Sequence, residues 1–255
     1  MASEVDAFEE FFSNAYRQEL NDLASGYPKQ RSLNADWALL SKYNPELADA
    51  FLKNPDANLK FAEEAASRAI LAPEGKTVRP HVRFFNLPQT ADVSVEYLGA
   101  EQLDKLSRVE GVVSWVTDIR PLMKVALWEC IHCEQTFKTV NEKGKLRKPA
   151  ICKCGRRDFR LVEQSSDFIN MQRAQMQEPV EKLRGNRPSS QIEVWMEDDL
   201  TNQIAPGQKV IVTGILRLRP SKDKRSERGV YEKFLDAQHL HKIEREFEEI
   251  VITKE

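Results

Sequence analysis

Four cysteines in the middle of the chain have the types and spacing of metal ligands. The stretch reads Cys130-Ile-His-Cys133, then 18 residues, then Cys152-Lys-Cys154, and the 255 residues contain no other cysteine. Two such pairs can enclose one tetrahedral ion, because each pair turns around one side of it. The sequence therefore predicts a metal site whose ligands are Cys130, Cys133, Cys152 and Cys154.

The expected cofactor at this site is structural Zn²⁺, since four cysteines close the coordination shell of that ion. The second pair is C-x-C instead of the commoner C-x₂-C, which leaves two alternatives open. His132 could replace one cysteine as a ligand, or the thiols could be buried without a metal. A catalytic zinc is not expected: His132-Cys133-Glu134 resembles half of the nucleobase-deaminase signature, but the P-C-x-x-C half is missing.

A run of cations near the end of the chain could contact phosphates. Six Lys and Arg residues stand between Arg217 and Arg228, against Asp223 and Glu227. Cations at the tip of a hairpin suit electrostatic contact with nucleic acid, although surface loops often carry charge without this role. The candidate DNA-binding residues of this basic hairpin are Lys222, Lys224, Arg225 and Arg228.

A second group combines arginines with an aromatic residue on two strand-like segments. Arg173 has Gln172 and Gln175 beside it, and Trp115 and Arg120 stand on an earlier segment. Arginine for phosphate and an aromatic ring for base stacking are typical of a groove that binds single strands. The alternative is a core tryptophan beside surface arginines. The candidate DNA-binding residues of this group are Arg120, Arg173, Trp115 and Gln175.

Composition and motifs give no support for an enzyme, a secreted protein or a membrane protein. Gly75-Lys76-Thr77 resembles the tail of a phosphate-binding loop, but Ile70 occupies the place of its first glycine. No run of about 18 apolar residues exists, and the acidic N-terminus lacks the apolar region of a secretory signal. The net charge is −2. We expect a cytoplasmic chain without catalytic activity of its own.

The apolar pattern changes its period near residue 79. Before it, apolar residues recur at helical spacing over 5–24, from Asn44-Pro45 to Leu52, and over 57–71, with a strand-like piece at 32–36. After it, a period of two predicts strands over 81–84, 106–116, 125–129, 159–161, 168–177, 191–196, 208–218 and 231–243. A short helix is expected near 99–105. The predicted fold is mainly β with a helical subdomain, and the strands favour an OB-type barrel that carries an inserted zinc knuckle.

Several segments in the correct order resemble the N-terminal region of archaeal minichromosome maintenance (MCM) replicative DNA helicases. They are Val109-Glu-Gly-Val-Val113, Asp118-Ile-Arg-Pro121, Trp128-Glu-Cys130, Gln177-Glu-Pro179-Val-Glu181, Asp198-Asp-Leu200, and the run from Ala205 to Leu216. The resemblance covers nearly the whole chain. It implies a helical subdomain at 1–78, the first part of an OB barrel at 79–128 and a zinc knuckle at 129–163. The second part of the barrel follows at 164–245, with the basic hairpin at 217–231, and then a linker at 246–255 towards an ATPase domain.

The resemblance also implies a function and partners. The chain is expected to be a DNA-binding and ring-assembly collar, a hexamer or double hexamer that contacts DNA phosphates in a central channel. It is expected to bind single-stranded and also double-stranded DNA in the nucleoid-associated cytoplasm of an archaeon. Its full-length parent would bind ATP and act as a DNA helicase. Trp115 and Gln175 stand where relatives carry basic residues. A signalling loop towards the ATPase is implied at Gln177, Glu178, Arg184, Gly185 and Arg187.

Two other functional classes remain open from the residues alone. A monomeric OB–zinc module that binds RNA would use the same barrel and the same cations, and ring assembly would distinguish it from the collar. A scaffold that binds only proteins would show no affinity for nucleic acid at low salt.

Overall fold

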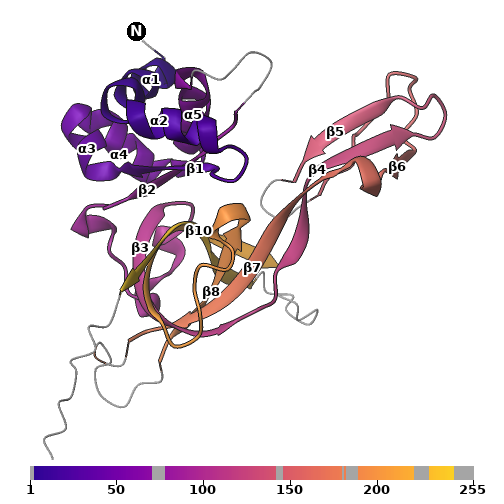
Figure 1. The fold of residues 1–255 in the computed structure, drawn as a ribbon. Helices are drawn as coiled ribbons and strands as arrows, with labels where there is room; N and C mark the ends of the chain where they lie inside the picture. The colour runs from indigo at the N-terminus through magenta and orange to yellow at the C-terminus, as the bar shows by residue number, and fades with distance from the viewer. Residues whose placement is uncertain are drawn as a thin grey trace, which may run out of the picture. The chain divides into compact units, whose positions relative to one another are not determined.

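A computed structural model of the chain describes residues 3–70, 78–141, 146–179, 181, 189–220 and 230–243. The chain forms two compact units (Figure 1), one of Met1–Thr117 with Arg173–Glu255 and the other of Asp118–Gln172. We call them the main unit and the knuckle unit. None of the helices in the described part of the chain is long and apolar enough to cross a membrane.

The main unit begins with a helical subdomain. Its elements are α1 (Glu4–Ala15), α2 (Arg17–Gly26), β1 (Ser32–Asp36), α3 (Trp37–Tyr43), α4 (Pro45–Lys53), α5 (Pro55–Ala69) and β2 (His81–Phe85). Local sequence explains several of the helix starts. Ser3 forms a capping box with Asp6, the side chains of Asp36 and Asn44 accept bonds from the first turns of α3 and α4, and α4 and α5 each begin with proline.

The single helix expected over 5–24 is wrong, because the chain breaks at Tyr16. The Tyr16 backbone has φ −130°, and its hydroxyl accepts a 2.6 Å hydrogen bond from the backbone N–H of Asp36. Its ring packs edge-on against Phe11, with centroids 5.6 Å apart. These tertiary contacts hold the residue outside helical geometry. Helix α3 was not expected, since its seven residues are too few to show a period.

Aromatic rings fill the core of the helical subdomain. Phe8, Phe12 and Phe51 are completely buried, and Phe51 lies 4.3 Å from the Phe84 ring of β2. Strand β2 pairs in parallel with β1 and not with the strands that follow it. From the sequence, the barrel was expected to begin at residue 79. Strand β2 instead belongs to the helical subdomain, because Val82 and Phe84 pack in the apolar core of the helices.

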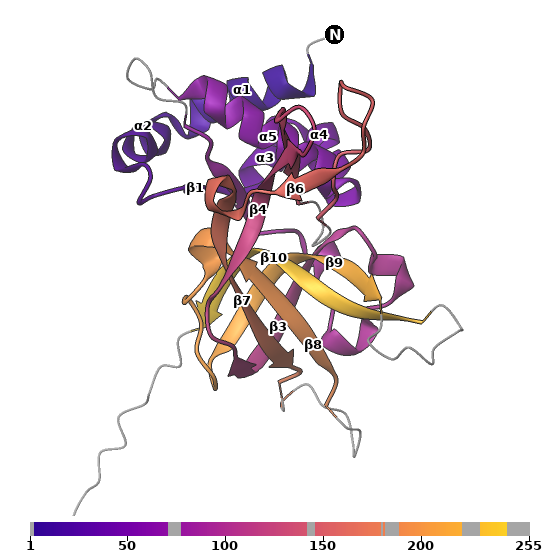
Figure 2. The ribbon, with the colours of Figure 1, turned by 90° about the vertical axis from the view of Figure 1, so that its right-hand side faces the viewer.

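The second part of the main unit is a closed five-stranded barrel, which confirms the OB-type prediction. Its strands are β3 (Leu106–Val116), β7 (Asp167–Gln177, of which residues 173–177 lie in this unit), β8 (Gln191–Glu197), β9 (Lys209–Pro220) and β10 (Tyr231–Ile243). They follow the order β3-β9-β10-β8-β7, and β7 pairs again with β3 (Figure 2). Short 3₁₀ turns connect them: η1 (Gln89–Ala91), η2 (Val95–Tyr97), η3 (Ala100–Gln102) and η6 (Asp198–Leu200).

Alternation along the strands separates the barrel core from its outer surface. Val109, Ala174, Val194 and Leu235 point into one apolar core. Gly111 of β3 must lack a side chain, since a Cβ there would lie 2.3 Å from Cγ of Met176. Because the even-numbered residues of β8 and of the barrel part of β7 (residues 173–177) are buried, the side chains of the odd-numbered residues lie on the outside of the barrel.

Two charged clusters join the helical subdomain to the barrel. In the first, the buried Arg83 of β2 pairs with Asp199 of η6 and donates to the Gln238 carbonyl oxygen of β10 at 2.8 Å. In the second, the guanidinium of Arg217 is 7% exposed and pairs with Asp56 of α5 and, at 2.6 Å, with Asp104. Arg217 therefore stabilises the fold and is not part of a phosphate-binding surface.

The knuckle unit is a long hairpin-like sheet. Its elements are β4 (Arg120–Cys130), β5 (Thr136–Val140), β6 (Phe159–Leu161), η4 (Glu163–Ser165) and the first part of β7. Strand β4 pairs antiparallel with each of the three strands. Phe137 and Phe159 meet edge to face at 5.5 Å, and Trp128 donates to the Thr139 hydroxyl at 2.9 Å. Strand β5 was not expected, because its apolar residues are few.

His239 should make the stability of the fold depend on pH. Burial lowers the pKa of His239 to about 4 from its usual 6.5, and the neighbouring charges of His241 and Arg83 act in the same direction. The ring stacks on Phe85 at the contact between β10 and β2. Below pH 6.5 the unfolded chain binds a proton that the folded chain binds only near pH 4, so stability falls across this range.

The variant His239→Gln removes the contribution of this imidazole to the pH dependence of stability. We expect the free energy of unfolding to fall less between pH 7 and pH 4.5 than in the wild type, by about 2 kcal/mol. Urea unfolding at the two pH values measures the difference. Parallel pH profiles for the two proteins would contradict the assignment.

Candidate functional site

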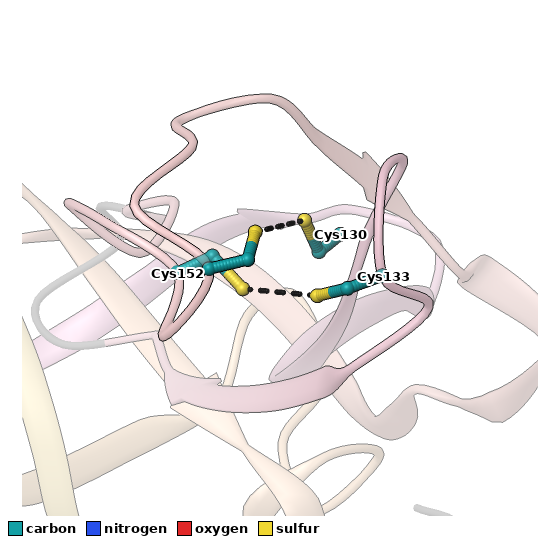
Figure 3. A group of neighbouring side chains, drawn as sticks. Cys130, Cys133 and Cys152 are labelled. Atoms are coloured by element: carbon teal, nitrogen blue, oxygen red, sulfur yellow. Dashed lines mark hydrogen bonds between the residues drawn. The ribbon is translucent and has the colours of Figure 1, made fainter.

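The four cysteines converge at one end of the knuckle unit. All four sulfur atoms lie within 4.8 Å of one another. The Sγ atoms of Cys130 and Cys154 are 3.7 Å apart, and those of Cys133 and Cys152 are 3.4 Å apart. Figure 3 shows Cys130, Cys133 and Cys152 pointing toward a common centre. Four sulfurs at these distances fit one tetrahedral metal ion with no position left for water or substrate.

Tight backbone turns bring the two pairs together. Cys130 ends β4, and its carbonyl oxygen accepts from the N–H of Glu134, which has a positive φ of 58°. On the other side, Cys152 donates its N–H to the Arg156 carbonyl oxygen at 2.8 Å. Gly155 follows the second pair with φ +80°, a conformation that glycine adopts without strain. The C-x-C spacing is thus accommodated by the glycine turn directly after it.

The backbone also prepares the thiols for a cation. The N–H groups of His132 and then Cys133 lower the pKa of Cys130 to about 6, because these donors favour its thiolate form. The pKa of Cys133 is raised to about 12: the N–H of Gln135 lowers it, but hydrogen bonds with the neighbouring thiols outweigh that effect. A metal ion would therefore have to displace protons, and its affinity would rise with pH.

His132 lies beside the sulfur cluster and does not belong to it. Its Nε2 is 3.2 Å from the Oδ2 atom of Asp158, and the four mutually close ligand atoms are all sulfurs. The structure therefore favours the four-cysteine set over the alternative in which His132 replaces one cysteine.

The barrel brings two of the predicted DNA-binding residues into contact. Trp115 of β3 lies opposite Gln175 of β7, and its indole N–H donates to the Gln175 side chain, which in turn donates to Gln191 of β8. The Trp115 side chain is 41% exposed. It is a surface residue whose indole is held by the Gln175 amide, and the alternative of a core tryptophan is wrong.

Arg173 lies on the same face, two residues before Gln175. Its guanidinium carbon is 4.6 Å from the centre of the Trp195 ring, and its Nη1 is 3.6 Å from Oε1 of Glu193. The indole also stacks on Phe234, with centroids 4.1 Å apart. Arg173 is therefore part of a stack that spans β10, β8 and β7.

Sequence reasoning did not find Glu193, Trp195 and Arg219 as parts of this surface. The alternation Gln191-Ile-Glu193-Val-Trp195 was visible and places the odd-numbered residues on one face. That Glu193 and Trp195 lie close to Arg173 and Arg219 depends on how the strands pair, and the local sequence does not indicate this pairing. We call the surface formed by Trp115, Arg173, Gln175, Gln191, Glu193, Trp195 and Arg219 the outer barrel face.

The other predicted site residues lie in the knuckle unit, at the end of β7 and just after it, or outside the described residues. Arg120 is the exposed first residue of β4 in the knuckle unit. Gln177 ends β7, and Glu178 is buried, with its N–H donating to the Ser190 carbonyl oxygen at 3.1 Å. Outside the described residues are Lys222, Lys224, Arg225, Arg228, Arg184, Gly185 and Arg187.

Two family models match most of the chain. The MCM N-terminal domain matches residues 5–86, and the MCM OB domain matches residues 94–220. The computed fold superposes with a TM-score of 0.80 on a crystal structure described as the N-terminal domain of an archaeal MCM. That match has 25% sequence identity and covers 94% of this chain and 98% of the other.

Curated relatives give the same family. The chain is 27% identical over 254 residues to the minichromosome maintenance protein MCM of Saccharolobus solfataricus, covering 95% of this chain and 36% of that protein. It is 26% identical over 240 residues to the DNA replication licensing factor mcm4 of Xenopus tropicalis, covering 88% of this chain and 28% of the relative. The chain thus spans about a third of the length of these relatives.

The sulfur cluster predicts one bound metal ion per chain. Elemental analysis of protein purified without added metal should show a stoichiometry near one, and Cys130→Ser or Cys152→Ser should lower it strongly, because either change opens the coordination shell. His132→Asn is the matched control and should retain the metal. Loss of metal from His132→Asn with retention in Cys152→Ser would contradict the four-sulfur site.

Proposed function

Because this chain belongs to the minichromosome maintenance (MCM) family, we propose that it is the DNA-binding and ring-assembly collar of an ATP-dependent replicative DNA helicase. This chain spans about a third of the length of its curated relatives. We therefore assign the helicase activity, with its ATP and its duplex substrate, to the proposed whole protein. The chain's own role in this proposal is to hold DNA and to order subunits around it. It catalyses no step.

The observation that carries the DNA-binding role is the exposed Trp115 on the outer barrel face. Its indole donates to Gln175, which Gln191 holds in turn, so a base that stacks on the indole meets a ring already oriented. Arg173 lies on the same face and offers a cation to a phosphate. Base stacking on aromatic rings beside arginines is how OB-type barrels hold single strands without sequence preference.

The basic segment between β9 and β10 supplies the second part of the proposal. Lys222, Lys224, Arg225 and Arg228 stand between the ends of two paired strands, Pro220 and Tyr231, in the sequence. In a ring of several chains, such cations would gather around a central channel and contact DNA phosphates. A net charge of −2 does not oppose this arrangement, because a ring can separate its cations from its acidic surfaces.

The remaining assignments concern the metal and the signalling loop. We assign structural Zn²⁺ to Cys130, Cys133, Cys152 and Cys154, since zinc favours a closed tetrahedral shell of thiolates. When bound, the ion would fix the turns of the knuckle unit. Gln177 and Glu178, with Arg184, Gly185 and Arg187, are proposed to carry contacts from the collar to the ATPase part of the parent.

Binding of a fluorescent oligothymidylate at rising salt tests the DNA-binding role. Changing Lys222, Lys224, Arg225 and Arg228 to Ala should weaken binding and flatten its salt dependence, by about 0.7 in the log–log slope for each phosphate that the variant no longer neutralises. Trp115→Ala should cost about 1–3 kcal/mol with little change in slope, since stacking releases no counterions. Light scattering on the same samples measures whether the chain forms a hexamer.

Tyr97→Ala is the matched control for the tryptophan, because Tyr97 is an aromatic residue of η2 that is 68% exposed. It should bind like the wild type. Absence of binding by the wild type at low salt would refute the DNA-binding role. Equal losses in Trp115→Ala and Tyr97→Ala would remove Trp115 from the binding surface.

A further inference from the structure

One carboxylate on the outer barrel face holds both of the arginines that lie close to Trp195. Glu193 lies on β8, and its Oε2 is 2.6 Å from Nη2 of Arg219 on β9. Its Oε1 is 3.6 Å from Nη1 of Arg173 on β7 and accepts a 2.9 Å hydrogen bond from the Trp195 indole N–H. Glu193 therefore pairs with cations from two different strands, and Arg219 pairs in addition with Glu232 of β10, whose Oε2 is 2.7 Å from Nε of Arg219.

Both arginines also lie close to one aromatic ring, the indole of Trp195. The guanidinium carbons of Arg173 and Arg219 lie 4.6 and 5.8 Å from the centre of the Trp195 ring. Phe234 also stacks on this indole. Because cation–π contacts do not involve the carboxylate, they should keep both guanidinium groups near their positions when Glu193 is neutralised.

The ion pairs of Glu193 can be exchanged for others. The side chain of Arg173 is 34% exposed, that of Arg219 is 22% exposed, and that of Glu193 is 17% exposed. Ion pairs that solvent reaches contribute little to stability, whereas arginine and phosphate form strong, often bidentate contacts. A strand that follows β7 past Trp115 would bring its phosphates to these arginines, whose charge is already paired with that of Glu193.

We propose that Glu193 restrains nucleic-acid binding by the outer barrel face, and that a phosphate of the bound strand replaces it as the partner of Arg173 and Arg219. The proposal rests on the DNA-binding role proposed above and adds a residue that sets the affinity. The aromatic stack orients the two cations, and Glu193 lowers their availability. Binding therefore requires an exchange of ion pairs on a surface that is already ordered.

The variant Glu193→Gln tests this directly, since the amide keeps the shape and an acceptor for the Trp195 N–H but has no charge. We expect affinity for a fluorescent oligothymidylate to rise about 3- to 10-fold at low salt, with a steeper salt dependence as further phosphate contacts form. Glu110→Gln is the matched control: it removes one negative charge on β3, where Glu110 lies 2.9 Å from Lys209. It should change affinity less than about 2-fold.

A second pair of proteins identifies the mechanism. In a background of Arg173→Gln and Arg219→Gln, the gain from Glu193→Gln should disappear, because the carboxylate then has no cation to hold. A gain that persists in this background, or an equal gain in Glu110→Gln, would overturn the proposal in favour of a general charge effect.

The outcome also separates the inference from the role on which it rests. If the wild type binds the oligonucleotide and Glu193→Gln binds equally or more weakly, the restraint by Glu193 is refuted while the DNA-binding role stands. If neither protein binds at low salt, the DNA-binding role itself is refuted, and this inference with it. Thermal melting of each variant shows whether its fold is retained.

Discussion

The pairing of β3 with both β9 and β7 is the constraint on which the rest of the main unit depends. It closes the barrel, separates a buried set of side chains from an outer set, and places Trp115 opposite Gln175. Close approach at Gly111 makes this closure possible, because Met176 occupies the space that a side chain would need. The exposed tryptophan is thus a consequence of barrel geometry as well as of local sequence.

The arginines of this chain differ in burial and in what they contact. Arg83 and Arg217 are buried and join the helical subdomain to the barrel through Asp199 and Asp56. Arg173 and Arg219 are more exposed, pair with carboxylates that solvent can reach, and lie close to the Trp195 ring. A buried pair would be costly to break, whereas a half-exposed pair can exchange its partner for a phosphate. Burial therefore decides which arginines belong to the fold and which to the proposed site.

Much of this architecture could be predicted from the sequence. Strand alternation is strong where one face is buried, so the boundaries of β3, β8 and β10 were expected nearly as observed, and the four cysteines were identified by spacing alone. The break at Tyr16 was missed because a distant backbone N–H causes it. The cluster around Glu193 was missed for a similar reason. Its residues lie on three strands, and the sequence does not indicate how these strands pair.

The most direct test of the account is to locate a bound strand on the protein. An oligonucleotide carrying 5-iodouracil can be photocrosslinked to the chain and the modified residue identified by mass spectrometry. We predict an adduct at Trp115, because a base stacks on its exposed ring. Adducts confined to the helical subdomain, residues 4–69, would show that nucleic acid binds elsewhere and would contradict the outer barrel face as the binding site.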